Sequence, residues 1–423
     1  MKLNYNHTRI AAYIGIFIQA IILNLPPVLF IIFKEDFGLD YEQLGSLTLI
    51  NFVIQIGVDL LMIKLGNIIS LRTQAVVANF FSVIGLLLLA LLPKAMPGEP
   101  FAALVIAEVF MAVGAGLIEV GISPLVSALP SSGNKAEMPL LHSFYCWGHV
   151  ATCLFSTLYL FIFNRDLWYI LPLVWAIIPL ANALMFMKVP VVPLVSEENR
   201  TPLRRILKSK AFLCGLLMMI CAGASEQSVA QWVSLFAEEA LHMPKLLGDL
   251  VALCGFALLM AMGRMLYGLF GAKLDLKKTL FVCGVGCFIS YLGLTLIPNP
   301  AVSLVFCALC GIFVSLMWPG TLEVTTSAFP LGGVGMFSLM SVMGDIGCSV
   351  GPFAVGAVSG AGEAGGSLFE LTSRLAEMLN ISSEAASLHL GILFAALFPA
   401  LLTLLALTYI ALSSKEKKKL QAE

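Results

Sequence analysis

Twelve long apolar stretches, separated by short polar segments, run through this sequence and restrict the folds open to it. A helix needs about 20 mostly apolar residues to cross the hydrocarbon core of a bilayer, and each stretch is long enough. Charged residues make up only 12% of the 423 residues, whereas a soluble domain carries about 25%. Backbone groups in lipid must be satisfied within a helix or a closed barrel, so we expect an all-α protein that spans the lipid bilayer. The expected spans are 8–33, 44–65, 74–93, 102–127, 139–163, 167–187, 211–236, 246–271, 279–297, 301–327, 334–359 and 388–412.

The positions of lysine and arginine orient these spans. When the twelve spans are threaded in order, most of the 24 Lys and Arg residues fall on one side of the membrane, including the basic run at 415–419. The positive-inside rule then places both termini in the cytoplasm, and we expect a multi-pass protein of the plasma or inner cell membrane. The formal net charge of −1 gives no basic footprint for nucleic acid.

The cysteines and the phosphate-binding motifs bear on catalysis and cofactors. The ten cysteines lie mostly inside apolar stretches without metal-ligand spacing, so we interpret them as small packing residues. The sequence contains no Walker-type phosphate loop. We therefore expect no enzymatic activity, no ATP hydrolysis and no resident cofactor.

A long polar segment at 189–210 divides the chain into two sets of six spans, 1–188 and 211–423. The acidic loop after the first span recurs in the same register after the seventh, at an offset of 203 residues. The matched pairs are Phe33 with Phe236, Glu35 with Glu238, Leu44 with Leu247 and Gly45 with Gly248. Parallel repeats of six spans are typical of transporters that bind their substrate near the midplane between the halves.

Four motifs resemble those of a known family. Over its full length the chain resembles the major facilitator superfamily, and within it the fucose/glucose/galactose permease-like branch. The resemblance implies twelve transmembrane helices in two pseudo-symmetric six-helix bundles, around a central substrate cavity. We expect it to act as a monomer. The motifs are IEVGISPLVSALP (118–130), LLHSFYCWG (140–148), GASEQSVAQWVSLF (223–236) and GRMLYGLFGAKLDLKK (263–278).

Two carboxylates in apolar spans are the candidates for cation coupling. An ionisable group at the centre of a membrane helix costs roughly 2.5–3.5 kcal/mol and usually marks a substrate or ion pathway. Glu119 lies in such a stretch, and Asp59 ends a polar stripe with Asn51 and Gln55 at helical spacing. By the resemblance, spans two and four border the cavity, so the two carboxylates would bind a proton, or sodium as their only candidate metal ion. The alternatives are a structural carboxylate and a hydrogen-bonded packing seam.

A second polar group, in span seven, fits a polyol substrate. Amides donate to and accept from hydroxyl groups, carboxylates accept from them, and an aromatic ring offers an apolar face. Polar packing between helices is the alternative interpretation. Ser123 stands where the branch usually has Asn, and the Trp318-Pro319 pair predicts a broken helix. The candidate substrate residues are Asn24, Ser123, His142, Tyr145, Glu226, Gln227, Gln231, Trp232 and Trp318.

Three further charged residues lie within spans. Asp345 is flanked by glycines, which favours a structural role in close helix packing. Arg264 belongs to the helix–loop signature and is expected to hold the inward gate rather than the substrate. Glu108 shares a helix face with Glu119 and is interpreted as a hydrated pathway residue. The segment 367–380 is amphipathic and is expected to lie on the outer membrane interface.

These features favour a secondary active transporter that imports a sugar or related polar solute with a proton or sodium ion by alternating access. One alternative is an exporter of drugs or metabolites. Another is a membrane sensor on the same fold that does not transport, for which carboxylates in a cavity would be unnecessary.

Overall fold

The computed structural model describes residues 3–65, 69–130, 137–191, 203–270, 274–297, 299–329, 333–363 and 366–422. These residues form helices and no strands. Twelve of the helical segments are long and apolar enough to cross a membrane. The prediction of twelve spans and an all-α membrane fold is confirmed. With an even number of spans, both chain ends lie at the same membrane side; we term it the proximal end and the opposite side the distal end.

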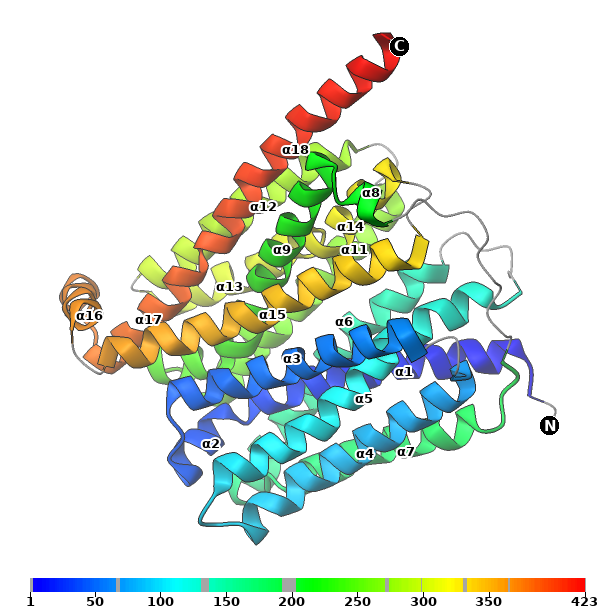
Figure 1. The fold of residues 1–423 in the computed structure, drawn as a ribbon. Helices are drawn as coiled ribbons and strands as arrows, with labels where there is room; N and C mark the ends of the chain where they lie inside the picture. Colours follow the sequence, from blue (N-terminus) through cyan, green and yellow to red (C-terminus); the bar gives the residue numbers. More distant parts are fainter. Residues whose placement is uncertain are drawn as a thin grey trace.

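The first six spans lie together in the lower part of Figure 1. α1 contacts α6, and α4 packs against both α5 and α7. The short helix α2 connects α1 to α3 at the distal end. The bounds are α1 Tyr5–Val28, α2 Phe30–Phe37, α3 Tyr41–Leu65, α4 Leu71–Ala95, α5 Pro100–Ala128, α6 Glu137–Phe163, η1 Arg165–Leu167 and α7 Ile170–Phe186.

The second six spans form the upper group, and several of them are interrupted. Span ten consists of α13 and α14, and span twelve of α17 and α18. The bounds are α8 Leu203–Ile206, α9 Lys210–Leu235, η2 Phe236–Ala240, α10 Lys245–Leu247, η3 Gly248–Leu253, α11 Cys254–Phe270, α12 Leu276–Leu296, α13 Pro300–Val314, α14 Met317–Ala328, α15 Gly333–Glu363, α16 Ser367–Leu379, α17 Ser383–Ala395 and α18 Leu397–Ala422.

The two most extensive contacts between the groups are those of α3 with α15 and of α6 with α11; α3 and α15 run side by side in Figure 1. Glycines allow α15 to approach α9 closely on its other side. A Cβ atom at Gly347 would lie 2.0 Å from the carbonyl oxygen of Ile220. The predicted close packing around Asp345 is therefore confirmed. This packing holds α15 in place against α9, beside the cavity.

The outer surface matches a lipid solvent. Large apolar side chains point outward, among them Phe161 and Ile162, each 67% exposed. The ten cysteines are free and buried, as expected of packing residues. The amphipathic segment forms helix α16 at the distal end, where Leu375 and Leu379 are buried and Met378 is exposed. Its placement on the membrane interface stays a prediction.

Candidate functional site

A cavity of about 130 Å³ lies between the two groups of helices. Both groups contribute polar side chains to it, so the shape of the cavity depends on how the two groups are placed relative to each other. Its lining contains three carboxylates and one guanidinium. The lining residues are Ile16, Gln19, Leu23, Phe52, Glu119, His142, Tyr145, Glu226, Gln227, Arg264, Trp318, Asp345 and Cys348.

Arg264 enters this cavity because span ten is broken. α13 ends at Val314 and α14 begins at Met317, as the Trp318-Pro319 pair predicted. Proline has no N–H, so Pro319 leaves the carbonyl of Ser315, four residues earlier, without its helical partner. The Nε atom of Arg264 donates to that carbonyl at 3.2 Å. The broken helix thus supplies the acceptor that holds a cation inside the membrane.

Glu226 on α9 is the carboxylate nearest to this cation. Its Oε2 atom lies 3.5 Å from Nη2 of Arg264. That distance exceeds the ≈2.7–2.9 Å of a charge-assisted hydrogen bond, and the contact is single rather than bidentate. The guanidinium of Arg264, which was expected to hold the inward gate rather than the substrate, lines the central cavity beside Glu226, and its role in the gate stays a prediction.

A cluster of three carboxylates adjoins the cavity, and two of its members, Glu119 and Asp345, line it. Oxygen atoms of Asp59 on α3, Glu119 on α5 and Asp345 on α15 all lie within 4.8 Å of one another. Gln19 donates to Glu119 at 2.9 Å. We call these three carboxylates the acidic cluster. Among the residues whose side chains the structure describes, no Lys or Arg forms an ion pair with it.

Asp345 changes the interpretation of this cluster. The sequence favoured a structural role for it, but Asp345 faces Asp59 and Glu119 from the opposite half of the molecule. One oxygen on Asp59 and one on Asp345 are buried with no hydrogen-bond partner. The clue in the sequence was the carboxylate itself, because intramembrane acids mark pathways by default. The flanking glycines explain the approach of α15 and not the role of Asp345.

Apolar and aromatic groups form the rest of the lining. Leu23, Phe52 and Cys348 make a small buried cluster against which Tyr145 and Trp318 pack. Gly344 is required there, because a Cβ atom would lie 2.1 Å from the ring of Trp318. His142, Tyr145, Gln227 and Trp318, all predicted substrate residues, line the cavity. Tyr145 interacts with the side chains of Asn24 and Gln227.

Trp232 and Gln231 do not line this cavity, contrary to the prediction. Trp232 is 0% exposed, and its indole N–H donates to the carbonyl of Pro352 at 2.9 Å. Pro27 leaves the carbonyl of Leu23 without a helical partner, and Gln231 donates to it at 3.1 Å. Gln231 therefore joins the halves on the distal side of the cavity, whereas the hydrogen bond of Trp232 lies within the second half.

Three other predicted residues have different outcomes. Asn24 is buried behind Tyr145 and outside the lining, where its amide donates to the carbonyl of Ala20. The side chain of Ser123 lies outside the described part of the chain. Glu108 accepts a 2.6 Å hydrogen bond from Asn51 and lines a separate, very small pocket with Gln231.

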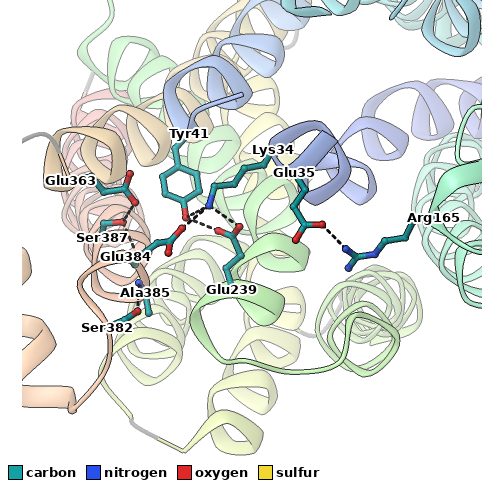
Figure 2. Close-up of polar contacts among 10 residues, drawn as sticks. All are labelled: Lys34, Glu35, Tyr41, Arg165, Glu239, Glu363, Ser382, Glu384, Ala385 and Ser387. Carbon is teal, nitrogen blue, oxygen red and sulfur yellow. Dashed lines mark hydrogen bonds and ion pairs between the residues drawn. The ribbon is translucent and has the colours of Figure 1, made fainter. Parts of the chain in front are cut away.

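The distal end is closed by ion pairs between the halves (Figure 2). Lys34 on α2 lies 2.8 Å from Glu239 and 2.7 Å from Glu384, and Tyr41 donates to Glu239 at 2.5 Å. We call these four residues, together with the adjoining pairs described next, the distal latch. Its elements come from α2 and α3 on one side and η2 and α17 on the other.

Arg165 forms the adjoining pairs. It lies 2.8 Å from Glu35 and also pairs with Glu238. Glu35 and Glu238 are the carboxylates that the internal repeat placed in corresponding positions. The recurring acidic loops thus bring two carboxylates to one arginine at the junction of the halves.

Comparisons with known proteins agree with this architecture. A sequence model described as Major Facilitator Superfamily matches residues 12–352. No curated protein sequence matches the chain. Its fold is similar to that of the E. coli fucose:proton symporter FucP, with a TM-score of 0.62 and 16% identity over 95% of this chain and 98% of that one.

Two other solved transporters are also similar. A bacterial homologue of the human lysosomal transporter Spinster, in an inward-facing and occupied conformation, has a TM-score of 0.71 and 13% identity over 97% of this chain and 98% of that one. The nucleoside transporter NupG has a TM-score of 0.68 and 12% identity over 96% and 99%. At these identities the likeness concerns the fold.

Proposed function

This chain belongs to the major facilitator superfamily and is a multi-pass membrane transporter, and from that premise we propose that it is a secondary active, cation-coupled importer of a sugar or related polar solute. The substrate occupies the central cavity, and the cation occupies the acidic cluster. The protein works as a monomer in the cell membrane, with both termini in the cytoplasm.

The observation that carries this proposal is the acidic cluster, which has members from both halves. Three carboxylates within 4.8 Å cannot all be charged in a site of low dielectric, so protons or a metal cation must neutralise them. Movement of one half relative to the other separates Asp345 from Asp59 and Glu119. Cation affinity then differs between the two conformations, which is the requirement for coupling.

A proton is the coupling ion that the burial of these groups favours over sodium. One oxygen of Asp59 and one of Asp345 are buried without a hydrogen-bond partner, and a neutral carboxyl group tolerates such burial better than a charged carboxylate. The remaining oxygens of the cluster are close enough to hold sodium, which makes sodium the direct competitor in any test.

The distal latch supports import with the cytoplasmic side accessible. If the termini are cytoplasmic, the latch closes the outer side. The cross-half bonds of Gln231 and Thr48, 3.2 Å apart, lie on that same side of the cavity. Two structures of the inward-facing Spinster homologue, with TM-scores of 0.71 and 0.72, fit this chain better than FucP in its outward conformation, at 0.63.

Proteoliposomes test the proposed function directly. Purified protein is reconstituted, a pH gradient or a sodium gradient is imposed, and uptake of labelled neutral and acidic sugars is followed. We expect uphill accumulation that follows the pH gradient and collapses with a protonophore. Accumulation that follows only sodium would reject the proton. Equilibration alone under every gradient would reject coupled transport.

A further inference from the structure

The guanidinium of Arg264 is poorly coordinated for a buried cation. Its recorded partners are one backbone carbonyl, the thioether of Met260 at 3.8 Å, the thiol of Cys146 and one oxygen of Glu226 at 3.5 Å. Sulfur is a weak acceptor, and the carboxylate contact is longer than a normal charge-assisted bond. A planar fork of five N–H donors therefore faces the cavity with few strong acceptors.

The rest of the lining is suited to a hydroxylated molecule. Gln227 and Tyr145 offer donors and acceptors, and His142 adds an imidazole. Trp318 and Phe52 give apolar faces for the C–H groups of a carbon chain or ring. A solute with several hydroxyl groups and one planar anionic group would use all of these surfaces.

We propose that the substrates are hydroxylated carboxylates, such as sugar acids, and that the substrate carboxylate replaces Glu226 as the partner of Arg264. This inference rests on the proposed function and specifies its substrate class. On binding, the two substrate oxygens accept bidentate hydrogen bonds from the guanidinium. Glu226, now separated from its cation, takes a proton from the aqueous side and becomes a neutral acid. The negative charge of the substrate and the positive charge of the proton cancel, so the net charge of the cavity does not change.

A carboxylate explains the site better than a neutral polyol does. Only the guanidinium offers a positive charge in the lining, whereas three carboxylates are present. A neutral hydroxyl accepts a single N–H bond and leaves the stretched ion pair unchanged, whereas a carboxylate matches the fork of the guanidinium with two parallel bonds. The protons needed to admit a further anion are taken up by Glu226 and by the acidic cluster.

Matched solute pairs test the proposal. Binding of galacturonate and galactose, and of gluconate and sorbitol, is measured by calorimetry on the purified full-length protein. Each pair differs mainly in the carboxylate. We expect the acidic member to bind at least about tenfold tighter, the effect of hydrogen bonds to a charged group. Equal binding, or tighter binding of the neutral member, would overturn the proposal.

Variants separate the roles of the two side chains. Arg264→Gln should abolish the preference for the acidic member, and Arg264→Lys should keep part of it, which guards against simple misfolding. Glu226→Gln should bind the acidic member with an affinity that depends less on pH near neutrality than that of the wild type. The exposed Arg374 on α16 gives the matched control, Arg374→Gln, with unchanged preference. A preference that survives Arg264→Gln would overturn the proposal.

Proteoliposome uptake keeps the two proposals distinguishable. If galactose accumulates with the proton gradient and galacturonate does not, the substrate class is wrong and coupled transport stands. If galacturonate binds through Arg264 but never accumulates against a gradient, the substrate class stands and coupling fails.

Discussion

The distal latch and the acidic cluster both bring charged side chains from the two halves together, but they differ in charge balance. In the latch, Lys34 meets Glu239 and Glu384, and Arg165 meets Glu35 and Glu238. The acidic cluster contains three carboxylates and, among the described side chains, no paired cation. Carboxylates that each have a cation partner can close an interface without a ligand, whereas carboxylates without one close it only after something neutralises them.

Solvation reinforces this difference. The side chains of Lys34 and Glu239 are 22% and 15% exposed, so water screens the latch. Asp59 and Asp345 are 3% and 2% exposed, so their repulsion is hardly screened. We therefore expect changes in the latch to shift a conformational equilibrium modestly, and changes in the cluster to abolish coupling.

The largest effect is expected at Glu119. Glu119→Gln mimics the protonated side chain and keeps its hydrogen bond to Gln19 possible. Exchange of substrate across the membrane should continue, while the accumulation ratio under a pH gradient falls to about one, because the linked ligand is lost. Counterflow and gradient-driven uptake in the same vesicles measure the two activities.

Asp59→Asn is the matched variant that tests sodium as the coupling ion. If sodium is coupled, Asp59→Asn should also lose accumulation, and the wild type should follow the sodium gradient. Full accumulation in both variants would show that neither carboxylate couples transport.

A second, smaller effect concerns stability at Asp345. Asp345→Asn removes one of three crowded like charges, so the purified protein should gain about 1–3 kcal/mol of unfolding free energy while losing coupling. Thermal unfolding in detergent and vesicle uptake report the two quantities. A loss of stability with intact accumulation would instead restore the structural role that the flanking glycines favoured.

A third effect tests the latch. Lys34→Met removes both of its ion pairs and should shift the ratio of distal-closed to distal-open molecules by roughly 5–30-fold toward open, about 1–2 kcal/mol. Reactivity of a single cysteine placed at Gly362 or Asn24 toward a membrane-impermeant reagent measures the shift. The charge-exchanged pair Lys34→Glu with Glu239→Lys should recover closure, and failure to do so would argue that packing holds the latch.

Length, apolar pattern and internal repeat were enough to predict the membrane fold, because lipid leaves helices few alternatives. The sequence also showed which spans carry charged residues. It could not show which way each side chain faces around its helix, or which partners the breaks in the helices leave free. Gln231 lies outside the cavity and donates to the carbonyl of Leu23, which Pro27 leaves without a helical partner. Arg264 lies in the cavity and donates to the carbonyl of Ser315, which Pro319 leaves without one. Each partner lies far along the chain, so no local pattern reveals it.

The same limit separates the two charged regions. The recurring acidic loop did point to Glu35 and Glu238, because a repeat carries its own register. The acidic cluster has no such counterpart: Asp345 meets Asp59 because α15 packs against α3 across the two halves.

The smallest effect is the pH response of the latch itself. Burial lowers the pKa of Lys34, but hydrogen bonds and charges from Glu239 and Glu384 outweigh burial and raise it above its usual 10.5. A group with a raised pKa contributes its full stabilisation below the ordinary value and loses it only as pH rises through the folded pKa. Between about pH 7 and pH 9 the latch should therefore change by less than about twofold. Cysteine reactivity at the distal end of a variant with Asp59, Glu119 and Asp345 all neutralised isolates this response. A several-fold change there would mean that the latch, and not only the acidic cluster, senses protons.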